Sequence, residues 1–218
     1  MSRVVSGIGM TSLRTRSRMI ERLREKGIRD ERVLAAIAAV PRHVFVEEAL
    51  ASRAYEDTAL PLGFSQTISQ PYIVARMIEV LRSGRELGKT LEIGAGCGYQ
   101  AAVLAQLTDE VYAVERIEPL LAKAKLNMRT IQQFKVRLKY ADGHLGLPEA
   151  APFDTIIVAA ASSCVPNALL QQLALGGRML LPLGTADQYL LLIERCADGY
   201  VETRLDNVRF VPLLSGLE

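Results

Sequence analysis

The second half of the chain alternates short apolar runs with helical stretches, and this alternation constrains the fold more than any other feature. Helical patterns separate the runs, at 100–107, 120–128 and 167–173. The runs themselves, which are typical of strands, are 90–93, 111–114, 136–140, 153–159 and 179–181. Strands that alternate with helices predict an α/β fold with a doubly wound, mostly parallel sheet.

The last part of the chain follows a different pattern. Gly176-Gly177 is expected to end the preceding helix, and Pro182 to close the strand that follows. Two longer strand-like segments then flank Ala197-Asp198-Gly199, which is a hairpin signal. These segments are 189–195 and 201–211. The sequence therefore predicts an antiparallel C-terminal hairpin at one edge of the sheet.

The first third of the chain predicts a helical extension rather than more sheet. Apolar residues recur at helical spacing over 17–26 and 31–40, with Gly27 placed to end the first helix and Asp30 to cap the second. Residues 42–71 then read as an irregular loop before another helix at 72–81, and a loop of that length in a compact domain is usually functional.

The length of 218 residues fits one domain with a full core. We expect a flexible N-terminal arm over 1–16 and a single domain over 17–218. Within that domain, 17–88 is predicted to be a helical and loop region that forms part of the active site. The cofactor-binding core is predicted over 89–218.

Composition excludes several classes of function. The 26 Lys and Arg against 24 Asp and Glu give a formal net charge of +2, and the chain lacks Trp, so nucleic-acid binding is not expected. No apolar run has the length of about 20 residues that a membrane helix needs. The three cysteines are widely spaced, which disfavours a disulfide framework or a metal site. We expect a cytoplasmic, monomeric protein with reduced thiols, no metal and no membrane partner.

The strongest local motif is LEIGAGCG, residues 91–98, where a strand runs into a glycine-rich turn and then a helix. Its spacing is Gly94-Ala95-Gly96-Cys97-Gly98, which differs from the Gly-x-Gly-x-x-Gly of dinucleotide folds. S-adenosylmethionine has no phosphate to place at a helix N-terminus, so its aminoacyl part fits such a turn. A tight strand-to-helix turn with no ligand is the alternative for this motif alone.

Acidic residues end the next two predicted strands. Glu115 lies 21 residues after Gly94, where an acid can hold both ribose hydroxyls; a surface pair with Arg116 is the alternative. Asp142-Gly143 ends the following strand, where the carboxylate could accept a hydrogen bond from the adenine amine; a plain Asp-Gly turn is the alternative. These elements would converge on the crevice where open α/β sheets bind ligands.

The motifs together resemble one family. LEIGAGCGYQ, VYAVER, ADGHLG, APFDTIIVAAA, LALGGRMLLPLG and VRFVPL occur in the order seen in the protein-L-isoaspartate (D-aspartate) O-methyltransferase family. The most diagnostic stretch is ALPLGFSQTISQPYIVARM, residues 59–77, and the similarity runs from about residue 17 to about 214. The resemblance implies the sheet of an S-adenosylmethionine-dependent methyltransferase. It also implies that the chain binds isoaspartyl-containing proteins and peptides.

The resemblance also implies roles for individual residues. Ser69 would be the catalytic residue and would contact the substrate. The C-terminal segment would help form the wall that receives the peptide, through Val211, Pro212 and Leu213. The cofactor would be bordered by Thr67 and Ile68, lined along its methionine by Gly94, Ala95, Gly96 and Gly98, and held at its ribose and adenine by Glu115, Arg116, Asp142 and Gly143. The chain departs from the family at Ser65, usually Gly, and at Ser162-Ser163, often Pro.

The implied reaction is transfer of a methyl group to the free α-carboxylate of L-isoaspartyl residues. That group has a reference pKa of about 3.5 and is already ionised near neutral pH, so no general base is needed. This agrees with a chain whose only two histidines, His43 and His144, do not form a catalytic pattern. The ester would lose methanol spontaneously to give a succinimide, whose hydrolysis returns some normal aspartate and so repairs the protein.

Three alternatives remain at this stage. The first is a methyltransferase of the same fold that acts on RNA or a small molecule. Residues 159–163 lack the Asn/Asp-Pro-Pro-aromatic motif of base amino methylation. The neighbours of Cys164 are mostly small or apolar, which is more typical of a packed cysteine than of a nucleophile. An NAD-dependent dehydrogenase is opposed by the glycine spacing. A cofactor-binding scaffold without catalysis is opposed by the intact segment around Ser69.

Overall fold

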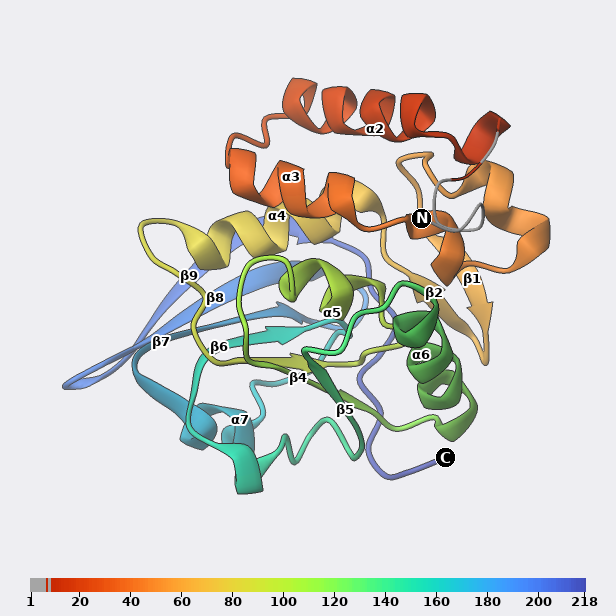
Figure 1. The fold of residues 1–218 in the computed structure, drawn as a ribbon. Coiled ribbons are helices and arrows are strands. Elements are labelled where there is room, and N and C mark those ends of the chain that lie inside the picture. Colours follow the sequence, from red (N-terminus) through yellow and green to blue (C-terminus); the bar gives the residue numbers. More distant parts are fainter. Residues whose placement is uncertain (1–6, 8) are drawn as a thin grey trace.

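The structure is a computed structural model, and the description covers residue 7 and residues 9–218. Its centre is a seven-stranded sheet in the order β5-β4-β3-β6-β7-β8-β9 (Figure 1). The strands from β3 to β7 run parallel, and β8 and β9 are antiparallel to their neighbours. Their bounds are β3 Thr90–Ile93, β4 Val111–Glu115, β5 Val136–Tyr140, β6 Phe153–Val158, β7 Leu173–Leu183, β8 Gln188–Cys196 and β9 Gly199–Val208.

Helices cover both faces of the sheet, which confirms the doubly wound prediction (Figure 1). One face carries α4 (Pro71–Arg82), α5 (Tyr99–Leu104) and α6 (Glu118–Thr130), with α2 (Leu13–Glu25) and α3 (Glu31–Ala39) as an outer layer. The other face carries α7 (Asn167–Gln172). No helix in the described part of the chain is long and apolar enough to cross a membrane.

The sheet separates two apolar cores, and β3 lies between them. Leu91 and Ile93 belong to the core on the α7 side, and all four residues of β3 are buried. Because successive side chains point to opposite faces, Glu92 projects from the other face. A strand between two covered faces therefore brings a carboxyl group into the interior next to the glycine-rich turn.

The N-terminal helix begins at Leu13, four residues before the expected start at residue 17. Arg16, predicted to lie in a flexible arm, is buried and donates to the hydroxyl of Tyr55 at 3.2 Å and to the carbonyl of Ala38 at 3.0 Å. These contacts with distant residues extend the folded region into the predicted arm, which periodicity alone could not show. The remainder of that prediction, residues 1–6 and 8, lies outside the described residues.

The segment 42–71, predicted to be irregular, contains regular structure. Two 3-10 helices, Arg42–Phe45 and Glu48–Arg53, precede a small antiparallel hairpin of β1 (Leu60–Gly63) and β2 (Gln66–Ile68). Phe64 and Ser65 form its tip with φ angles of 53° and 55°. Both values lie in the left-handed region that favours glycine, so Ser65 in place of the usual Gly carries a conformational cost.

Two boundaries near the C-terminus also differ from the predictions. Gly176-Gly177 does not end α7, which stops at Gln172; both glycines lie inside β7, because that strand begins immediately at Leu173. The last strand ends at Val208 rather than 211. The chain then leaves the sheet and pairs with Ala161, whose N–H donates to the carbonyl of Val211 at 2.8 Å.

Candidate active site

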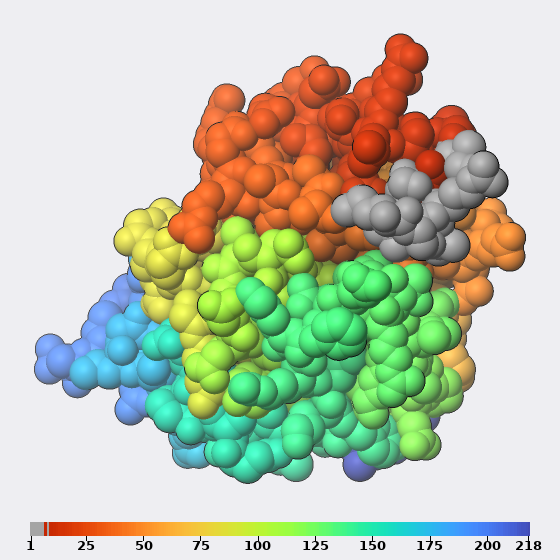
Figure 2. Space-filling view, viewed as in Figure 1, coloured from red at the N-terminus to blue at the C-terminus, as the bar shows by residue number. Residues whose placement is uncertain are grey.

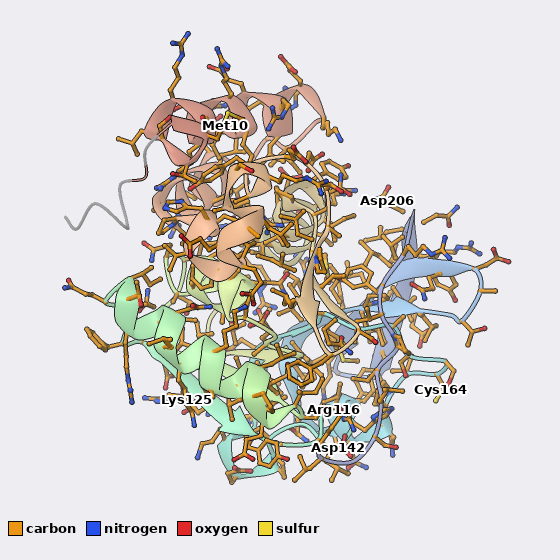
Figure 3. All side chains as sticks on the ribbon, turned by 90° about the vertical axis from the view of Figure 1, so that its right-hand side faces the viewer. Met10, Arg116, Lys125, Asp142, Cys164 and Asp206 are labelled. Atoms are coloured by element: carbon orange, nitrogen blue, oxygen red, sulfur yellow. The ribbon has the colours of Figure 1, made fainter. Side chains whose placement is uncertain are left out.

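A cavity that is partly open to solvent lies at the carboxyl ends of the parallel strands. Its walls come from the β1–β2 hairpin, the turn after β3, the end of β4, the loops after β5 and β6, and the segment 211–214. Figure 3 looks onto this side of the molecule, with Arg116 and Asp142 close together beneath α6. The residues that the sequence predicted for one crevice are therefore brought to one place, although Gly98 and Asp142 do not themselves line the cavity.

The glycine-rich turn forms the floor of this cavity. The N–H groups of Gly94 and Ala95 both donate to the carbonyl of Val114, which ties the turn to the end of β4. Gly98 begins α5 with a φ of 88°, and a Cβ there would lie 2.9 Å from the terminal methyl of Met128. Glycine at 98 is therefore favoured chiefly by the backbone conformation, and α6 also packs closely there, with Cβ of Ala124 3.3 Å from the same position.

Glu115, the last residue of β4, is buried and accepts hydrogen bonds with both carboxylate oxygens. One oxygen accepts from the N–H of Gly96 at 2.7 Å and the other from the N–H of Ile117 at 2.9 Å. Each carboxylate oxygen has a second lone pair, so the group can still accept from two ligand hydroxyls. The acid thus orients the glycine-rich turn and faces the cavity.

Asp142 and Arg116 both hold the C-terminal segment. Asp142 accepts from the N–H of His144 at 2.9 Å and from the N–H of Gly216 at 2.6 Å. Arg116 donates to the carbonyl of Gly216 and to the carboxylate of Glu218, both at 2.8 Å. Arg116 also lines the cavity, and its guanidinium is engaged with the C-terminal segment.

Gly143 follows Asp142 and closes this end of the cavity. A Cβ at 143 would lie 2.5 Å from Cγ2 of Ile93 and 3.3 Å from Cδ1 of Leu213. The Asp-Gly turn is therefore packed tightly between β3 and the C-terminal wall, where no larger residue fits.

Sequence reasoning missed Glu92 and Gln100, which line the same cavity. Glu92 is fully buried, and its Oε2 has no hydrogen-bond partner among the described residues. Burial raises its pKa well above the usual value, against a lowering by Gln100, and the nearby Glu115 raises it further. The signal in the sequence was an acid inside an otherwise apolar strand, two residues before Gly94.

A second cavity, which is also open to solvent, adjoins the first. Four residues line both cavities: Thr67, Ser69, Ala159 and Val211. Ser69 follows β2 directly and shows no hydrogen bond of its hydroxyl to any described residue. Neither His43 nor His144 lines either cavity.

The second cavity lies between the segment that joins β2 to α4 and the end of β9 with the residues that follow it. Its lining carries one charged side chain. That side chain is Arg209, which is exposed and has no ion pair within the described part of the chain. Its neighbours in the lining are neutral, among them Gln70 and Asn207. An uncompensated cation in a groove favours an anionic ligand.

A parallel sheet with this glycine-rich turn, and with an acid at the end of the next strand, defines an S-adenosylmethionine-dependent methyltransferase. The model of a protein family, described as "Protein-L-isoaspartate(D-aspartate) O-methyltransferase (PCMT)", matches residues 14–218 of this chain. The chain belongs to this family.

Individual relatives agree with that assignment. A protein-L-isoaspartate O-methyltransferase of Dechloromonas aromatica is 76% identical over 216 residues, covering 99% of this chain and 100% of the relative. That of Aromatoleum aromaticum is 63% identical over 210 residues, covering 96% of each. A Plasmodium falciparum protein assigned to the same activity, solved with S-adenosyl-L-homocysteine, is 25% identical with a TM-score of 0.78, covering 92% of this chain and 98% of the other.

Proposed function

We propose that the protein transfers a methyl group from S-adenosylmethionine to the free α-carboxylate of L-isoaspartyl residues in damaged proteins and peptides. The observation that carries this proposal is the junction of the two cavities at Ser69 and Thr67. A methyl donor in the first cavity and a peptide in the second would meet there. Family membership supports the assignment of the donor and of the acceptor.

The first cavity offers a buried acid to a cationic donor, and a bound cation would favour the ionised form of that acid. S-adenosylmethionine carries an ammonium and a sulfonium, and the buried carboxyl of Glu92 offers an unpaired oxygen that a cation would satisfy. Glu115 would hold the ribose hydroxyls and Gly143 would border the adenine. When bound, the cofactor supplies an activated methyl group for attack by a nucleophile.

The second cavity fits a peptide with an extra negative charge. Arg209 would attract the isoaspartyl α-carboxylate, and Ser69 would donate one hydrogen bond to it. The task of these residues is positioning, since a carboxylate held in a near-attack pose needs no deprotonation and positioning can contribute several kcal/mol. A single hydroxyl donor holds the acceptor in place without binding it so strongly that the barrier rises.

The test is a paired-peptide assay with methyl-labelled cofactor, an isoaspartyl peptide and its normal aspartyl twin. We expect base-labile label on the isoaspartyl peptide alone, because only that peptide presents a free α-carboxylate within the chain. Label on both peptides, or on neither, contradicts the proposal. Label on RNA or on small molecules instead would support an alternative acceptor on the same fold.

We also propose that the protein works as a monomer in the cytosol. Cys164 and Cys196 are exposed free thiols, which agrees with a reducing compartment. Sedimentation at micromolar concentration should give a mass near the 23.9 kDa of one chain.

A further inference from the structure

Ser69 is placed by its neighbours in the chain, because its hydroxyl makes no hydrogen bond to another residue that the structure describes. On its N-terminal side, Ile68 pairs with Leu60 in the β1–β2 hairpin. On its C-terminal side, Gln70 and then Pro71 lead into α4. Ser69 and Gln70 are thus the whole connection between a strand and a helix, and the position of the serine depends on how this connection is held.

Asp57 holds the C-terminal side of the connection. One of its carboxylate oxygens accepts from the amide of the Gln70 side chain at 2.9 Å, and the other accepts from the backbone N–H of Tyr72, also at 2.9 Å. The second contact satisfies a free N–H in the first turn of α4, as a capping residue does. The carboxylate of Asp57 therefore binds both the first turn of α4 and the residue next to Ser69.

Lys26, at the end of α2, fixes Asp57 from the opposite direction. Its ammonium donates to the carboxylate oxygen that also receives Gln70, and it lies 5.5 Å from the centre of the Tyr72 ring. Burial alone would raise the pKa of Asp57, but the hydrogen bonds from Lys26, Tyr72 and Gln70 lower it below the usual value. The carboxylate is therefore ionised at neutral pH and links the N-terminal extension to the active-site segment.

We infer that Asp57 is a positioning residue for the proposed methyl transfer, acting through Gln70 to hold Ser69 at the junction of the two cavities. The inference rests on the proposed function. Asp57 lines neither cavity, so it acts on the reaction only through the residues that it holds. Because hydrogen bonds orient Gln70 and not Ser69 directly, loss of the contact should misplace the serine without removing it.

The variant Asp57→Asn isolates this role. Asparagine keeps one oxygen that can still accept from Tyr72, but its amide nitrogen then faces two other donors, from Gln70 and Lys26. We expect kcat for the isoaspartyl peptide to fall about 10- to 100-fold, as a misplacement of roughly 1 Å does. The affinity for S-adenosylhomocysteine should stay close to that of the wild type.

The chain offers a matched control in Asp30. It caps α3 through the N–H groups of Arg32 and Val33 at 2.9 and 3.2 Å, and it pairs with Arg82 at 2.8 Å. Asp30→Asn therefore also disturbs a helix cap with an ion pair, away from both cavities. We expect both variants to lower Tm, and only Asp57→Asn to lower kcat.

A double-mutant cycle separates positioning from general damage. Gln70→Leu removes the other half of the same hydrogen bond, so kcat of Asp57→Asn/Gln70→Leu should match that of Gln70→Leu alone rather than the product of the two losses. The inference would be overturned if the losses in kcat of Asp57→Asn and Gln70→Leu multiplied in the double variant. It would also be overturned if Asp57→Asn and Asp30→Asn had equal kcat. A wild type that does not methylate the isoaspartyl peptide contradicts the proposed function instead. An active wild type with an equally active Asp57→Asn contradicts only the role of Asp57.

Discussion

The carboxylate of Glu115 accepts a hydrogen bond of 2.7 Å from the backbone N–H of Gly96, so the acid at the end of β4 holds the glycine-rich turn that follows β3. The two residues are 19 positions apart in the chain and meet because β3 and β4 are parallel neighbours. The shape of the cofactor cavity therefore depends on a contact between two strand ends. Figure 2, in the same view as Figure 1, shows the helical extension (red to orange) on top of the rest of the domain.

Replacing Glu115 by Gln should weaken cofactor binding. The amide of glutamine would face one of the two buried N–H groups that the carboxylate accepts, and a lost hydrogen bond to a charged group costs about 1.5–3 kcal/mol. We expect the Kd for S-adenosylhomocysteine to rise about 10- to 100-fold in calorimetry. Glu110→Gln, at an exposed acid just before β4, is the control. Equal affinities of the two variants would contradict the role of Glu115.

Removing the hydroxyl of Ser69 should slow turnover more than it weakens cofactor binding. Ser69→Ala deletes one hydrogen-bond donor at the junction of the cavities, and we expect kcat to fall about tenfold. The affinity for S-adenosylhomocysteine should be retained. Ser65→Gly, at the exposed hairpin tip, should leave kcat unchanged. Unchanged turnover in Ser69→Ala would show that its assigned role is wrong.

Neutralising Arg209 should raise KM for the isoaspartyl peptide, because the second cavity then loses its one charged side chain. We expect an increase of about threefold to tenfold at low ionic strength and a smaller one near 0.5 M salt, where exposed charges are screened. The comparison is Arg209→Gln against Arg129→Gln, whose arginine lies in the last turn of α6 and lines neither cavity. A KM that is the same in both variants at every salt concentration would argue against electrostatic capture.

The Asp30–Arg82 pair should make stability depend on pH in the acidic range. Burial alone would raise the pKa of Asp30, but hydrogen bonds from Arg82 and from the N–H groups of Val33 and Arg32 lower it below 3.8. A lowered pKa contributes stability above the value of the unfolded chain, and the contribution is lost as the pH falls through the folded value. The Tm difference between wild type and Asp30→Asn should therefore be full at about pH 7 and shrink below about pH 4. A constant difference across this range would contradict the assignment.

Local patterns account for most of the fold. The strand at 90–93 was predicted with its observed bounds. A short and mostly apolar run between a lysine and a glycine-rich turn is typical of a strand that is buried on both faces of a parallel sheet. The pairing of strands and the exact ends of the elements were harder to predict from the sequence. The stretch 42–71 was expected to be irregular, yet it contains the β1–β2 hairpin, since its tip at Phe64-Ser65 adopts φ angles that these residues rarely take.

By itself, the sequence determined the alternation of strands and helices, the glycine-rich turn, and the acid at the end of the next strand, because these depend on spacing within a few turns of chain. Only the tertiary structure decided which side chains share a cavity. It placed Glu92, with one carboxyl oxygen unpaired among the described residues, beside Glu115, engaged Arg116 with Gly216 and Glu218, and brought Asp57 to Gln70. Such contacts join residues far apart in the chain, and they depend on packing that no local pattern records.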